Sequence, residues 1–114
     1  MSERILRVNS EIQKAISSIL MTEIKNPMIK GLITVTKVDT TSDLEQCKVY
    51  ISIYEEEGRD EVFNAIKHSA GFIRRELAHS VDLRKVPFLT FYLDTSYDYG
   101  QRIEETINKI NSQK

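Results

Sequence analysis

Apolar residues recur at helical spacing through the first quarter of the chain. Steps of three and four residues separate them, which places them on one side of an amphipathic helix. This stripe consists of Ile5, Val8, Ile12, Ala15, Ile16 and Ile19. The pattern predicts a helix from residue 2 to about residue 25, with Ser2 as its N-cap. Asn26-Pro27 should end it, because the residue before a proline is pushed away from helical angles.

Two runs of strand-like sequence follow this helix. Residues 32–38, after Gly31, are rich in β-branched side chains and predict a strand. Residues 39–43 are all turn formers. Residues 47–54 then alternate between apolar and more polar side chains, which is typical of a strand with one buried face. Because the connection is short, we expect an antiparallel hairpin.

A second helical stripe lies beyond a charged loop, Glu55-Glu56-Glu57-Gly58. It keeps its phase through Val62, Ile66, Ala70, Ile73, Leu77 and Val81. Gly71 lies in its middle and costs about 1 kcal/mol relative to alanine in a helix interior. The segment is therefore either one helix with a weak point or two helices with a kink. Pro87 should begin a third strand, and a final amphipathic helix with Ile103, Ile107 and Ile110 should follow, capped by Ser96 or Asp98.

These elements predict an α+β fold in the order helix, strand, strand, helix, helix, strand, helix. A long helical connection between the second and third strands favours a right-handed parallel crossover. The sheet should then be three-stranded and mixed, with helices on one side. Its other face would be open unless a partner or the C-terminal helix covers it.

Composition and charge narrow the class of protein. At 114 residues, 40% hydrophobic and 29% charged, the chain fits one domain, residues 1–114. No segment is apolar enough for a membrane span or a signal peptide, so we expect a soluble protein in the cytoplasm. Cys47 is the only cysteine, which excludes an intramolecular disulfide or a cysteine zinc cluster, and it should be buried.

Net charge is −1, but it is unevenly spread along the chain. It amounts to +2 over residues 1–30, −5 over 31–66, +3 over 67–93 and −1 over 94–114. A polyanion would therefore bind one face of the protein rather than the whole surface.

Six short motifs carry a resemblance to a known family. They are Ile24-Lys25-Asn26-Pro27, Ser42-Asp43-Leu44, Lys48-Val49-Tyr50-Ile51, Ala70-Gly71-Phe72-Ile73-Arg74, the run from Leu83 to Phe91, and Asp94-Thr95-Ser96 with Gly100-Gln101-Arg102-Ile103. The chain resembles ribosome-binding factor A, a family of bacterial ribosome-maturation proteins built on a type II K homology fold. It departs from the family's pattern by Met28 where an arginine is usual and by Ser69 where an alanine is usual.

The resemblance implies a non-catalytic assembly factor, without cofactor or metal, that acts during late maturation and rRNA processing. Its implied partners are the small (30S) ribosomal subunit and its rRNA. Ribosomal proteins or an assembly GTPase are further candidates, no membrane is involved, and a monomer is expected.

A helix that starts afresh at Gly71 would point unpaired amides outward and let a phosphate come close. Basic residues gather around this position in the sequence. The candidate RNA-binding residues are Lys67, Ser69, Ala70, Gly71, Arg74, Arg75, Arg84 and Lys85, with Lys25, Lys30 and Arg7 as a possible extension. Gly71 could instead be a close-packing position or a helix C-cap. The second glycine of an ordinary K homology loop is absent, so we expect recognition of RNA shape more than clamping of a single strand.

Other residues suggest different chemistry less strongly. The tyrosines at 50, 54, 92, 97 and 99 could stack on bases, although we expect most of them to pack against a covering helix. His68 and His79 would lie about 16 Å apart along a straight helix, which is too far for one metal ion. The alternative function is a protein interaction module that recruits a basic ribosomal or assembly protein through its acidic face. That face contains Asp43, Glu45, Glu55, Glu56 and Glu57.

Overall fold

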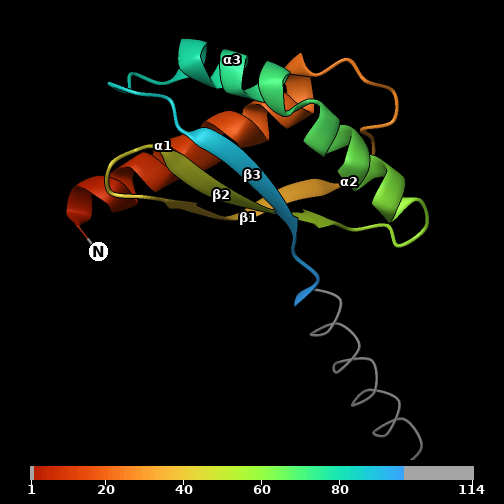
Figure 1. Ribbon diagram of the computed structural model, residues 1–114. Helices are drawn as coiled ribbons and strands as arrows, with labels where there is room; N and C mark the ends of the chain where they lie inside the picture. The colour runs from red at the N-terminus through yellow and green to blue at the C-terminus, as the bar shows by residue number, and fades with distance from the viewer. Residues whose placement is uncertain (1, 97–114) are drawn as a thin grey trace, which may run out of the picture.

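Helices cover one face of a three-stranded sheet in the computed structural model, which describes residues 2–96 (Figure 1). The elements are α1 (Glu3–Ser18), η1 (Ile19–Glu23), β1 (Ile33–Thr40), β2 (Gln46–Ile53), α2 (Arg59–His68), α3 (Ala70–Ser80) and β3 (Phe88–Leu93). The expected α+β class and element order are confirmed as far as β3. The expected C-terminal helix lies outside the described residues.

The first helix begins as its sequence predicts. Ser2 is the N-cap, and its Oγ accepts a hydrogen bond from the Ile5 amide at 3.2 Å. The helix ends slightly earlier than expected, in the π-helical segment η1, whose last turn is closed by a bond from the Ile24 amide to the Ile19 carbonyl at 3.0 Å. The Asn26 side chain then accepts from the Met28 amide at 3.0 Å, which turns the chain toward β1.

The sheet has the predicted mixed topology. β1 and β2 form an antiparallel hairpin in which Val38 is opposite Val49, with an irregularity between Val35 and Lys37. β2 and β3 are parallel, and Val49 is opposite Phe91. β1 runs further than expected, so the turn comes later, and Leu44 in it is buried with a φ of 62°. A buried leucine in the left-handed region is not foreseeable from turn-forming residues alone.

The second helical stripe is two helices. Ser69 separates α2 from α3 with φ −90° and ψ 7°, and its amide bonds to the carbonyls of Ala65 and Ile66. The kinked alternative is therefore confirmed, but α3 starts at Ala70 rather than at Gly71. The helical phase survives the break, since Ile66 and Ile73 are both fully buried on the sheet side.

One apolar core joins the helices to the inner face of the sheet. Ile12 and Ile16 of α1 are fully buried in it together with Val49 and Ile51 of β2. Cys47 is buried as predicted, and this burial raises the pKa of its thiol above the usual range. Within residues 2–96, none of the helices is both long and apolar enough to cross a membrane.

Candidate nucleic-acid interface

The start of α3 is open to an approaching group. Gly71 lies exposed in the first turn of α3, and a Cβ at this position would meet no atom within 4 Å beyond its chain neighbours and the nearby helix backbone. Its φ lies outside the left-handed region, and it stands at the beginning of a helix, so the structure contradicts both the close-packing and the C-cap explanation. The first amides of a helix have no intrahelical acceptor and form its positive end. Gly71 therefore leaves the surface beside this positive end open to an anion.

A shallow hollow of about 340 Å³ lies beside this helix start. It is lined by Gly71, Arg74, Arg75, Ala78 and Val86. α3 supplies its first four residues, and the segment before β3 supplies Val86. The structure thus brings together three of the predicted binding residues on one side of α3.

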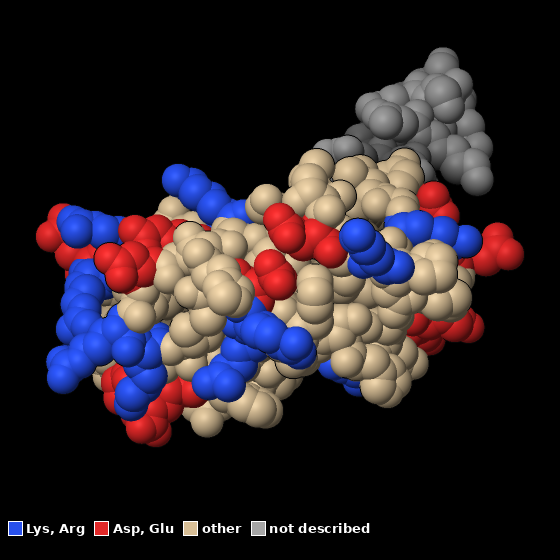
Figure 2. All heavy atoms as spheres, turned by 90° about the horizontal axis from the view of Figure 1, so that it is seen from above, with Lys and Arg blue, Asp and Glu red and all other residues tan. Residues whose placement is uncertain are grey.

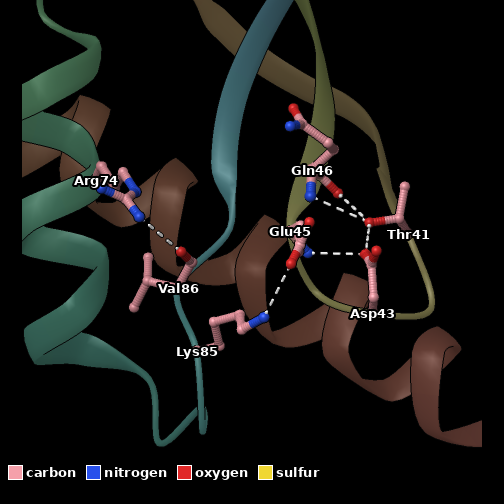
Figure 3. A network of polar contacts seen from close by, with 7 residues as sticks. All are labelled: Thr41, Asp43, Glu45, Gln46, Arg74, Lys85 and Val86. Atoms are coloured by element: carbon pink, nitrogen blue, oxygen red, sulfur yellow. Dashed lines mark hydrogen bonds and ion pairs between the residues drawn. The ribbon is translucent and has the colours of Figure 1, made fainter.

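Arg74 is already engaged by the protein's own backbone (Figure 3). Its Nε donates to the carbonyl of Pro87 at 3.1 Å and its Nη2 to the carbonyl of Val86 at 2.9 Å. The forked guanidinium thereby joins α3 to the segment that leads into β3. Arg74 positions this side of the hollow, and its direct contact with RNA stays a prediction.

The hairpin turn between β1 and β2 also contacts the segment that leads into β3 (Figure 3). Lys85 Nζ lies 3.2 Å from Glu45 Oε1, and the Phe88 amide donates to the Glu45 carbonyl at 2.9 Å. Asp43 braces the turn by accepting from the Thr41 hydroxyl at 2.7 Å and from the Glu45 amide at 3.0 Å. These donors, the Thr41 hydroxyl first, hold the pKa of Asp43 below its usual value. The positive charge of Lys85 is thus partly neutralised by Glu45.

Two exposed cations in this region of the sequence are not engaged by the protein itself. Neither the Arg75 nor the Arg84 side chain forms a hydrogen bond or ion pair with another residue in the described part of the chain. Arg75 lines the hollow beside Gly71, whereas Arg84 lies in the segment that follows the end of α3 and does not line it. Lys67, just before the break, extends over the Phe63 ring with its Nζ 5.2 Å from the ring centroid. Ser69 and Ala70 are half-buried at the break itself. Arg75 is therefore the side chain best placed to meet a phosphate beside Gly71.

The remaining predicted residues lie elsewhere on the surface. Lys30 lines a separate hollow with the acidic residues Glu55, Glu57 and Glu61, close to the start of α2. Lys25 is exposed after η1, and Arg7 is exposed on α1. The helical side of the molecule carries its densest group of basic side chains at the end where α1 begins and α3 ends, with acidic side chains between them (Figure 2). The hollow beside Gly71 does not include Lys25, Lys30 or Arg7.

The expected packing of most tyrosines against a covering helix stays a prediction. Tyr50 and Tyr92 stack on each other at outward positions of β2 and β3. The sequence signal for this pair was the aromatic residues at outward positions of β2 and β3. Tyr97 and Tyr99 lie outside the described residues. Among residues 2–96, no group of three or more His, Cys, Asp or Glu side chains could hold a metal ion.

The arrangement defines a small α+β domain in which an interrupted helix pair crosses between the two parallel strands of a mixed sheet. The ribosome-binding factor A family model matches residues 4–107. Relatives with this name include proteins of Macrococcus caseolyticus, 43% identical over all of both chains, and of Caldanaerobacter subterraneus subsp. tengcongensis, 39% identical over 100% of this chain and 94% of the relative. The chain belongs to the ribosome-binding factor A family.

Solved structures agree with the fold. The crystal structure of ribosome-binding factor A from Thermus thermophilus has a TM-score of 0.66 at 23% identity, over 78% of this chain and 93% of that one. The solution structure of a Thermotoga maritima protein described as a putative ribosome-binding factor A has a TM-score of 0.65 at 26% identity, over 81% and 88% of the two chains.

Proposed function

We propose that this protein is a non-catalytic assembly factor that binds the small ribosomal subunit and its rRNA during late maturation in the cytoplasm. The observation that carries the proposal is the exposed first turn of α3 at Gly71, with the unengaged Arg75 side chain lining the same hollow. Family membership supports it. A Thermus thermophilus relative, 22% identical, has been fitted as a homology model into the cryo-EM map of a 30S complex.

The mechanism uses binding energy alone. A phosphate of the RNA lies against the amides of the first turn of α3, where the positive end of the helix favours an anion. Arg75 adds charge beside Gly71, while Arg74 and Lys85 hold the segment before β3 in place. In this proposal the break at Ser69 replaces the glycine loop of K homology domains, and the fold is a type II variant of that architecture. Recognition then depends on RNA shape and backbone.

Co-sedimentation with purified ribosomal subunits tests the proposal. We expect the protein to pellet with small subunits, more with immature than with mature ones, and less as the salt concentration rises. The salt effect follows because each phosphate contact releases counterions. Large subunits are the control, since they offer the same phosphate charge without the specific site. Equal binding to both subunits, or binding to neither, contradicts the proposal.

A second candidate is supported by the hollow at the start of α2. It measures about 340 Å³ and combines apolar residues such as Met28 and Val62 with Glu55, Glu57 and Glu61. Apolar walls with acidic groups suit the aliphatic stem and charged head of a lysine or arginine from a basic protein. Under this alternative, neutralising Glu57 and Glu61 as glutamines weakens subunit binding and changes at Gly71 do not.

A further inference from the structure

One face of the sheet carries a row of exposed aromatic side chains. All the described helices lie on the opposite face (Figure 1). Phe88 is 60% exposed, Tyr54 48% and Tyr92 41%, and Tyr50 lies beside Tyr92 in the parallel register. We call Tyr50, Tyr54, Phe88 and Tyr92 the aromatic face. Exposed rings on adjacent strands are costly to leave in water, which points to a binding surface.

The centre of this surface is a stacked pair. The ring centroids of Tyr50 and Tyr92 are 5.4 Å apart, and the ring planes differ by 24°. Lys37 extends over the Tyr50 ring, with its Nζ 5.7 Å from the centroid. Neither hydroxyl of the pair bonds to another residue in the described range. The pair thus offers flat π surface, two unused hydroxyls and an adjacent cation.

A shallow hollow continues the surface at one end. It has a volume of about 140 Å³ and is lined by Leu32, Thr34, Ser52 and Tyr54. An aromatic ring and a leucine can hold the flat face of a base, while the two hydroxyls can bond to its edge.

Polar residues separate the rings elsewhere. Lys48 and Thr90 stand between the Tyr50–Tyr92 pair and Phe88 in the strand register. This face therefore lacks the continuous apolar patch that a tightly packed protein interface has at its core. Spaced rings with cations between them are instead typical of surfaces on which nucleotides stack.

The aromatic face is surrounded by both positively and negatively charged side chains. Lys37 and Lys48 are exposed cations. Asp39 stands opposite Lys48, and the Asp94 carboxylate accepts from the Thr36 hydroxyl at 2.6 Å and from the Ser96 hydroxyl at 2.6 Å. These donors, the Ser96 hydroxyl first, lower the pKa of Asp94, so its carboxylate stays ionised. The cation beside the stacked pair is Lys37.

We infer that the aromatic face binds unpaired RNA nucleotides by stacking, as a second RNA contact on the side opposite the helices. This inference rests on the proposed function and extends it. The protein then holds one RNA segment at the start of α3 and another, single-stranded, on the sheet. Such an arrangement fixes two RNA segments relative to each other.

Fluorescence anisotropy with a short, unstructured, labelled oligouridylate tests the inference. Tyr92→Leu keeps apolar bulk but removes the aromatic ring, so we expect it to weaken binding by about tenfold. Tyr92→Phe keeps the ring and is the matched control, with binding within about twofold of the unaltered protein. Thermal unfolding of each variant checks that the fold is retained. Equal binding by Tyr92→Leu and the unaltered protein, or no binding by the unaltered protein, overturns the inference.

Two further comparisons separate this inference from the proposed function. Gly71→Glu should lose affinity for small subunits yet bind the oligouridylate normally, because the change is on the helical side. If the unaltered protein fails to bind small subunits while Tyr92→Leu still loses oligouridylate binding, the proposed function fails alone. If Tyr92→Leu weakens subunit binding but not oligouridylate binding, a protein occupies this face and the inference is overturned.

Discussion

Replacing Gly71 by glutamate is expected to weaken binding to the small ribosomal subunit by about tenfold or more, which corresponds to about 1.4 kcal/mol or more. The new side chain fills the open space above the first turn of α3 and places a negative charge where the phosphate would lie. The fold should become more stable, not less. Glutamate is a better helix former than glycine by up to about 0.8 kcal/mol, and an acid near a helix start adds about 0.3 to 1 kcal/mol.

Because binding should weaken while the fold becomes more stable, a loss of affinity cannot be explained by unfolding. Asn64→Glu adds the same charge to an exposed position of α2 and serves as the control. Gly71→Ala adds only a methyl group, which meets no protein atom within 4 Å, so it should keep the stability gain with a smaller loss of affinity. If Gly71→Glu and Asn64→Glu bind subunits equally well, the phosphate does not lie at Gly71.

Replacing Arg74 by alanine is expected to lower the free energy of unfolding by about 1 to 2 kcal/mol, since hydrogen bonds from a charged donor are worth somewhat more than neutral ones. The change removes the bonds to the Val86 and Pro87 carbonyls and frees the segment before β3 from α3. Thermal denaturation followed by circular dichroism should show a midpoint lower by roughly 4 to 10 °C.

The neighbouring arginine is the matched control. Arg75 has no hydrogen bond or ion pair within residues 2–96, so Arg75→Ala should change stability by less than about 0.5 kcal/mol. Arg74→Lys keeps the charge but not the forked geometry and should recover only part of the loss. Equal midpoints for Arg74→Ala and Arg75→Ala would show that the bonds from Arg74 to the Val86 and Pro87 carbonyls contribute nothing to stability.

Periodicity alone was sufficient for most of the fold. The helical stripes and the alternation around Val49 and Ile51 predict the helices α1, α2 and α3 and the strand β2, because one-sided burial imposes these repeats. The π-helical geometry of η1 has no such signal. The antiparallel hairpin and the parallel crossover follow from connection length. The expected start of the second helix is off by one residue, because the low helix propensity of Gly71 marks a weak point but not the residue at which the chain leaves helical geometry, which is Ser69.

The candidate site was less predictable, because it depends on contacts between distant residues. The sequence places Arg74 and Arg75 side by side, and only the folded segment at Val86 and Pro87 shows that one of them is engaged. Lys85 and Glu45 lie in chain segments of opposite net charge, and their ion pair joins residues that are far apart in the sequence. The alternation in β2 and β3 places Tyr50 and Tyr92 on one face of the sheet, but only the folded strands show that the two rings stack on each other.

The dependence of subunit affinity on salt tests the central claim most directly. Binding of the unaltered protein and of Arg75→Ala to small subunits would be measured over a series of potassium chloride concentrations, with Lys14→Ala as a control that removes one charge from α1. If Arg75 contacts a phosphate beside Gly71, its removal lowers the slope of log affinity against log salt by about 0.7 to 1, and Lys14→Ala leaves the slope unchanged. Identical slopes for all three proteins would contradict an RNA interface at the start of α3.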